Sequence, residues 1–194
     1  MKKYCIFGGT FNPPHIAHSI IAEEVREKLN LDKIIFIPSG NPPLKNSIPA
    51  MHRFNMARAA FSGNKNFEVS DIEIINTDEK SYTVNTLLNL KEKYKDEGTE
   101  LYFVIGSDNL IDLPRWKDPG IILELSKVVV IKRPGFNTEN SPEEFRKKVI
   151  YVETPLLDIS SSEIRQKVKE GKSIKYFVHP EVEEYIYKNK LYKC

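Results

Sequence analysis

The sequence predicts an α/β protein with a doubly wound parallel sheet and helices on both faces. Short runs rich in β-branched and aromatic residues recur along the 194 residues, and several are separated by segments with apolar residues at helical spacing. Each run lies far enough from the next for a crossover helix, which a parallel strand pair requires. Because this βαβ rhythm continues along the chain, a Rossmann-like sheet is the expected architecture.

Six runs are expected to form the strands. They are, in chain order, Tyr4–Phe7, Lys33–Pro38, Phe67–Ser70, Leu101–Ile105, Val128–Ile131 and Val149–Val152. The spacing of apolar residues predicts helices from Ile16 to Leu29 and from Val84 to Leu90. Two further helix starts combine a serine cap with acidic residues in the first turn: Ser141-Pro142-Glu143-Glu144 and Ser160-Ser161-Ser162-Glu163.

Length and composition favour one domain over residues 1–194 with a small-molecule partner. Lysine and arginine number 29 against 27 aspartates and glutamates, a balance that gives no case for a nucleic-acid binder. The two cysteines, Cys5 and Cys194, form no disulfide framework, and no apolar run approaches the roughly 18 residues of a membrane span. We therefore expect a cytoplasmic protein without a membrane segment. A homo-oligomer stays open.

The stretch GGTFNPPHIAH follows the first predicted strand, at the edge of the sheet where ligands of such folds bind. Gly8 and Gly9 allow a positive φ and a close approach of the backbone to an anion, and Thr10 adds a hydroxyl. His15 and His18 are expected on the first turn of the next helix, on one face. A lone glycine pair more often marks only a turn, and a lone first-turn histidine is more often solvated. The string matches neither GxGxxG nor GxxxxGK(S/T), which disfavours hydride transfer and a standard ATPase.

This stretch resembles the signature of the (T/H)xGH nucleotidyltransferase superfamily, and its GGTFNPPH form is similar to the bacterial nicotinate-nucleotide adenylyltransferase family. Further segments match that family in order: IPSGNPPLK (Ile37–Lys45), SYTVNTL (Ser81–Leu87), FVIGSDNL (Phe103–Leu110), RW (Arg115-Trp116), KRPG (Lys132–Gly135), ISSSEIR (Ile159–Arg165) and VHPEVEEYI (Val178–Ile186). The resemblance implies transfer of AMP from ATP to nicotinate mononucleotide, giving nicotinate adenine dinucleotide and pyrophosphate in NAD biosynthesis. Mg²⁺ would arrive with ATP, held mostly by phosphates and water.

The resemblance also implies three groups of site residues. His15, His18 and Arg165 would be catalytic, as donors to the phosphates of ATP, with no covalent intermediate. The other ATP-binding residues would be Gly8, Gly9, Thr10, Phe11, Lys45, Gly106, Asp108, Ile159, Ser160 and Ser161. The nicotinate mononucleotide would be bound by Tyr82, Thr86 and Trp116, through stacking on the tryptophan and through backbone groups near the threonine. No resident metal is expected, because the HxxH pair has no third ligand at matching spacing.

Several of these residues have a plainer interpretation. The helix start at Ser160 suits a phosphate chain together with Arg165, but a capped helix with an exposed arginine looks much the same. Asp108 could accept hydrogen bonds from ribose hydroxyls or only cap a helix. Trp116 could stack on a pyridine ring or pack in the core, and Lys45 could be a solvated loop lysine.

Three residues depart from the family pattern. Ala17 stands where glycine is usual, Leu44 where histidine is common, and Asn85 where aspartate is common. These differences concern fine contacts, rate and affinity rather than the class of reaction. Two other functions stay open: another transferase of the superfamily, such as a pantetheine-phosphate adenylyltransferase or a cytidylyltransferase, and a nucleotide-binding module without turnover. Trp116, the SYTxxTL segment and the chain length favour the nicotinate enzyme.

Overall fold

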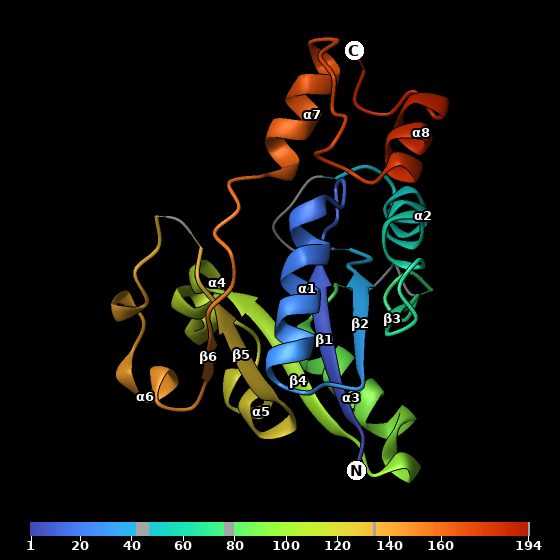
Figure 1. The fold of residues 1–194 in the computed structure, drawn as a ribbon. Helices are drawn as coiled ribbons and strands as arrows, with labels where there is room; N and C mark the ends of the chain where they lie inside the picture. The colour runs from blue at the N-terminus through green and yellow to red at the C-terminus, as the bar shows by residue number, and fades with distance from the viewer. Residues whose placement is uncertain (42–46, 76–79, 134, 194) are drawn as a thin grey trace.

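The computed structural model describes residues 1–41, 47–75, 80–133 and 135–193. These residues form a six-stranded sheet in the order β3-β2-β1-β4-β5-β6, and every neighbouring pair is parallel (Figure 1). The strands are β1 Lys3–Gly9, β2 Lys33–Pro38, β3 Phe67–Val69, β4 Glu100–Gly106, β5 Lys127–Ile131 and β6 Ile150–Val152. All six predicted strands are confirmed, with boundaries that move by at most two residues.

The helices of the described residues are α1 Ile16–Lys28, α2 Ala50–Phe61, α3 Thr83–Lys93, α4 Ser107–Asp112, α5 Pro119–Leu125, α6 Glu143–Arg146, α7 Ser161–Lys169 and α8 Pro180–Lys188. The predicted helices at α1 and α3 are confirmed. The cap predicted for α7 is also confirmed, because the Ser160 hydroxyl accepts a hydrogen bond from the Glu163 N–H at 3.1 Å.

The cap predicted at Ser141 is wrong. Its hydroxyl is buried and donates to the Leu110 carbonyl at 3.1 Å, near the end of α4. Pro142 takes the N-cap position, and α6 is only four residues long. A tertiary acceptor 31 positions away therefore competes successfully with the local helix for this hydroxyl.

Alternate residues of the strands build two separate hydrophobic clusters, because successive side chains of a strand point to opposite faces. One cluster joins Cys5, Phe36 and Val129 with residues of α1, α2, α7 and α8. The other joins Ile6, Ile35 and Val128 with residues of α3, α4 and α5. The predicted doubly wound sheet with helices on both faces is confirmed.

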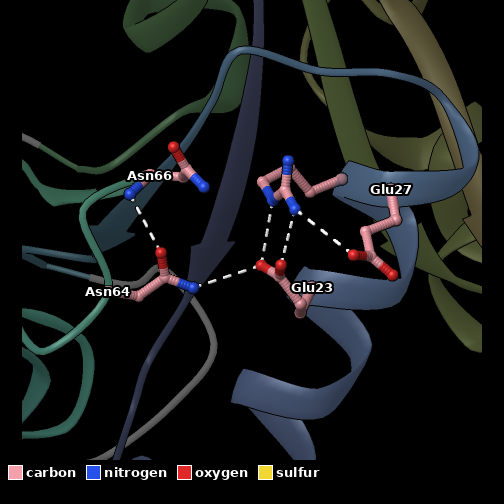
Figure 2. Close-up of polar contacts among 5 residues, drawn as sticks. Glu23, Glu27, Asn64 and Asn66 are labelled. Carbon is pink, nitrogen blue, oxygen red and sulfur yellow. Dashed lines mark hydrogen bonds and ion pairs between the residues drawn. The ribbon is translucent and has the colours of Figure 1, made fainter.

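A polar network fixes the outer side of α1 to the turn that precedes β3 (Figure 2). Arg26 donates to Glu23 through Nε at 3.0 Å and Nη2 at 2.6 Å, and lies 3.6 Å from Glu27. The Asn64 side chain donates to Glu23 at 3.2 Å and accepts from the Asn66 N–H at 2.9 Å. These contacts link α1 to the turn that follows the C-terminal end of α2.

The strand order places the predicted motifs together. The first two crossovers carry the chain from β1 to β2 and then to β3 on one side, and the third returns it to β4 on the other side of β1. The carboxyl ends of β1 and β4, at Gly9 and Gly106, thus flank the point where the strand order reverses, which is where doubly wound sheets bind ligands. In Figure 1, α7 and α8 lie beyond these strand ends. No helix formed by the described residues is long and apolar enough to cross a bilayer.

Candidate active site

The loop from β1 to α1 turns at Phe11 rather than at its glycines. Gly8 and Gly9 belong to the extended strand, whereas Phe11 has a φ of 48°. The expectation that the glycines supply a positive φ is therefore wrong. A Cβ on Gly9 would lie 3.0 Å from the Phe11 ring, so that glycine serves close packing instead. The Phe11 ring is 3% exposed within the core, which leaves only its backbone to meet a nucleotide.

The two motif histidines lie face to face at the start of α1. His15 is the N-cap rather than a first-turn residue, and its ring stacks on that of His18 with centroids 3.7 Å apart. The His15 backbone N–H donates to Nδ1 of His18 at 3.1 Å. Because Nδ1 is an acceptor in this bond, a neutral His18 carries its proton on Nε2. The loop therefore sets the tautomer of His18 and leaves Nε2 as a hydrogen-bond donor.

The pKa values of both imidazoles are lowered, which favours their neutral forms. Burial, followed by the nearby Arg133 charge, lowers the pKa of His15 from its ordinary 6.5 to about 4. Burial, followed by the charges of His15 and Arg133, lowers the pKa of His18 well below its ordinary value. Among the described residues, the buried Nδ1 of His15 has no hydrogen-bond partner. An anion at this helix start would meet two neutral imidazoles and the positive end of α1.

Helix α7 contacts the same loop from the far end of the chain. Arg165 donates through Nη1 to the Asn12 carbonyl at 2.8 Å, and the Ser161 hydroxyl donates to the Pro13 carbonyl at 2.8 Å. Arg165 also donates through Nη2 to the Ser162 hydroxyl at 3.2 Å, so its guanidinium is held beside the N-terminus of α7. The structure thus brings Ser160, Ser161 and Arg165 to the histidine loop. Ile159 is partly buried against the core there, next to the exposed Ser160.

The segment after β5 adds a cation that the sequence analysis missed, and it contacts the residues that follow β4. Arg133 donates through Nη1 to Asp108 at 2.8 Å, and the Arg133 backbone N–H donates to the Ser107 hydroxyl at 2.9 Å. A Cβ on Gly106 would lie 2.3 Å from Oδ1 of Asp108, so only glycine lets this carboxylate lie against the strand end. Arg133 lies within the matched KRPG segment, whose cationic residues were the signal that could have identified it.

One cavity of about 630 Å³ opens beside the loop between β1 and α1. Its lining includes the predicted nucleotide-loop residues Gly8, Gly9 and Thr10, together with the predicted acceptor residues Tyr82, Thr86 and Trp116. The Trp116 ring is partly exposed, with its centroid 6.2 Å from that of Phe103. The tryptophan is therefore supported from within the core on one side and accessible from the cavity on the other.

Glu73 is a second residue that the sequence analysis missed, and it changes the role available to Thr86. The Thr86 hydroxyl donates to Oε1 of Glu73 at 2.6 Å and lies 3.3 Å from the Tyr82 carbonyl. That hydroxyl is therefore engaged within the protein. The backbone N–H of Thr86 lies 3.3 Å from the same carbonyl, inside the first turn of α3. The donors that a carboxylate could use are instead the first N–H groups of α3, at the cavity wall formed by Ser81, Tyr82 and Thr83.

The predicted site residues therefore fall into two adjoining halves. We name the cavity the acceptor half, and the histidine pair with Arg165, Arg133 and Asp108 the nucleotide half, after the roles predicted for the residues of each. Lys45 and Leu44 lie outside the described residues. No group of three or more metal-ligating side chains occurs within the described part of the chain.

Comparisons with known proteins identify the family. A family model described as cytidylyltransferase-like matches residues 6–167. A protein of Caldicellulosiruptor saccharolyticus named "Probable nicotinate-nucleotide adenylyltransferase" is 42% identical over 98% of this chain and 99% of its own length. A protein of the same name from Clostridium tetani is 40% identical over 100% of both chains.

A solved structure agrees with these relatives. The nicotinic acid mononucleotide adenylyltransferase of Plasmodium falciparum, complexed with NaAD, matches with a TM-score of 0.82 and 26% identity, over 99% of this chain and 98% of that chain. The predicted family and enzyme class are thereby confirmed: the chain belongs to the nicotinate-nucleotide adenylyltransferases, within the cytidylyltransferase-like family.

Proposed function

We propose that this site transfers AMP from ATP to nicotinate mononucleotide, with the ATP phosphates at the histidine loop and the acceptor in the neighbouring cavity. The observation that carries the proposal is the junction of these two half-sites at Gly8, Gly9 and Thr10, at the carboxyl end of β1. An acceptor phosphate lying over this junction would face the α-phosphorus. Catalysis then depends on positioning and on stabilising charge rather than on a protein nucleophile.

His18 acts in this proposal as a donor to the α-phosphate. Its Nδ1 accepts from the His15 N–H, which directs the proton of the neutral ring to Nε2. A neutral donor fixed in this way stabilises charge that builds on the phosphate oxygens without reorganising during the step. His15 stacks on His18 and offers a second imidazole to the neighbouring phosphates.

Two arginines would bind the remaining phosphate charge. Arg165 is already oriented by the Asn12 carbonyl and lies next to the first N–H groups of α7. Arg133 follows β5, and its charge already lowers the pKa of both histidines. Asp108 orients Arg133 through Oδ2, while its buried Oδ1 has no partner among the described residues and could accept from a ribose hydroxyl.

The acceptor half supports a pyridine ring that carries a carboxylate. Trp116 offers an aromatic face supported by Phe103, and the N-terminus of α3 offers backbone N–H groups and a positive dipole end. We infer that the carboxylate lies at the start of α3 rather than at the Thr86 hydroxyl, which Glu73 occupies.

Mg²⁺ would enter with ATP. The described side chains around the histidine loop are imidazoles and guanidiniums, and the carboxylate of Asp108 is paired with Arg133. Such a donor set suits an ion held by phosphates and water, which would neutralise part of the triphosphate charge. We also propose that the enzyme acts in the cytoplasm, a setting consistent with the free buried thiol of Cys5.

Pyrophosphate release from ATP with defined acceptors tests the proposal. We expect rapid release with nicotinate mononucleotide and little with pantetheine phosphate, while cytidine triphosphate should not replace ATP. Release with pantetheine phosphate but not with the mononucleotide would assign the site to another transferase. Binding of ATP without release in the presence of any acceptor would indicate a nucleotide-binding module.

A further inference from the structure

Arg53 is a buried cation with an unusual set of partners. It lies on α2 and is 1% exposed. Its guanidinium donates to three backbone carbonyls: Nε to Ile48 at 3.1 Å, Nη1 to Thr10 at 2.9 Å, and Nη2 to Gly40 at 3.0 Å. Among the ion pairs of the described residues, none involves Arg53.

A buried arginine at this position lowers the stability of the fold relative to an apolar side chain. Burial of an unpaired charge is unfavourable, and burial lowers the pKa of Arg53 even though the charge of Glu73 acts in the opposite direction. An apolar side chain would fill the same position on α2 without that cost. The reason for an arginine must therefore lie in what its three bonds hold together.

Two of the three carbonyls belong to segments that lead to different halves of the active site. Thr10 is part of the loop between β1 and the histidines, and it lines the cavity. Gly40 follows β2 and precedes Asn41, whose N–H donates to the Ser81 hydroxyl at 3.1 Å and whose carbonyl accepts from the Ser81 N–H at 3.0 Å. Ser81 directly precedes the N-cap of α3, where we place the carboxylate of the acceptor.

Gly40 also packs closely against the turn that carries Glu73. A Cβ on Gly40 would lie only 1.9 Å from the Glu73 carbonyl oxygen, so only glycine allows the two segments to pack this closely. The Glu73 carboxylate in turn accepts from Thr86 on α3 at 2.6 Å. A continuous series of contacts therefore runs from Thr10 through Arg53 and Gly40 to the first turn of α3.

We propose that Arg53 is a positioning residue that fixes the spacing between the nucleotide half and the acceptor half of the site. This inference rests on the proposed function, because an in-line attack requires both phosphates to be aligned over Thr10. The planar guanidinium donates in several fixed directions, which a lysine ammonium on a flexible stem cannot reproduce. A displacement of about 1 Å between reacting groups is enough to cost on the order of 100-fold in rate.

The test compares ligands that occupy one half with a ligand that spans both. Arg53→Lys and Arg53→Gln are titrated calorimetrically with an unreactive ATP analogue, with nicotinate mononucleotide and with the dinucleotide product. We expect each single-half ligand to change its affinity by less than about threefold, while the dinucleotide weakens by about tenfold or more because its two ends no longer fit at once. The kcat should fall by about 10-fold to 100-fold.

Arg58→Lys and Arg58→Gln are the matched controls, since Arg58 is an exposed arginine on the same helix. They should leave all three affinities and kcat unchanged. If both Arg53 variants fail to fold, Gly40→Ala disturbs the same series of contacts from its other end and should give the same pattern. A dinucleotide affinity that falls no more than those of the single-half ligands would overturn the positioning role. Wild-type turnover with nicotinate mononucleotide, measured in parallel, tests the proposed function separately.

Discussion

Replacement of His18 by asparagine and by glutamine separates its two nitrogens. Asparagine places its amide oxygen near the position of Nδ1, where it can still accept from the His15 N–H, but it has no group at the position of Nε2. Glutamine reaches the position of Nε2 with an N–H donor. The two variants therefore divide the structural bond, which is 3.1 Å long in the protein, from the proposed contact with the α-phosphate.

The magnitudes follow from these two roles. Loss of one preorganised donor to a developing oxyanion costs about 2.7–4 kcal/mol, so His18→Asn should lower kcat by about 10²–10³. Its free energy of unfolding should change by less than the roughly 0.5–2 kcal/mol expected when a helix cap is lost, because the cap acceptor is retained. His18→Gln should keep more activity than His18→Asn.

The assay is steady-state pyrophosphate release at saturating ATP, with thermal unfolding measured on the same samples. His52→Ala serves as the control, because that ring bonds to the Tyr185 hydroxyl at 3.0 Å, away from the motif, and should leave kcat near the wild-type value. A His18→Asn enzyme with kcat within threefold of wild type would refute the donor role. The motif would then be only a strand-to-helix turn.

Four further predictions follow from the geometry. Trp116→Ala should raise the KM for nicotinate mononucleotide by about two- to tenfold, the equivalent of about 0.5–1.5 kcal/mol of stacking, with little change in ATP affinity; unfolding of this variant would instead make the tryptophan a core residue. The amides at the start of α3 should favour the nicotinate over the nicotinamide mononucleotide by about 100-fold or more in kcat/KM, and equal values would contradict that placement. Tyr192→Phe removes the hydroxyl that donates to Oδ1 of Asn12 at 2.8 Å, so kcat should fall by about two- to tenfold; Tyr187→Phe, at a more exposed position, should have no effect. His15 has a pKa of about 4 in the folded protein against an ordinary 6.5, so the unfolded chain binds more protons between these values and stability is lost as pH falls from 6.5 towards 4. That loss should reach at most about 3 kcal/mol, and His15→Gln should show a flatter dependence of Tm on pH; equal slopes would argue against a buried neutral His15.

Local signals in the sequence account for the elements that it predicted. The strands are short continuous apolar runs, and α7 begins with a serine whose hydroxyl caps its own first turn. Helix α2 was missed because its buried face includes Arg53 beside Met56, Ala57 and Phe61, which interrupts the apolar pattern. The short helices α4 and α5 were missed because six or seven residues carry too few apolar repeats to define a period.

The sequence by itself also determined which polar groups the loop between β1 and α1 and the start of α7 carry. Two histidines at a helix start and a serine-capped helix that carries an arginine are local patterns, and both place polar groups at helix N-termini, whereas the role expected for the two glycines was wrong. The order of the strands was not determined in this way, because the βαβ rhythm is compatible with several arrangements of parallel strands.

Only the tertiary structure decided how these parts are held. Tyr192 and Asn12 are 180 positions apart, and Arg165 and Asn12 are 153 apart, yet both pairs form hydrogen bonds at the loop between β1 and α1. The Thr86 hydroxyl faces Glu73 rather than a ligand because the turn after β3 packs against α3. A sequence pattern specifies which donors and acceptors a segment carries, but their partners depend on which segments pack together. That packing is set by the burial of the two clusters on either face of the sheet.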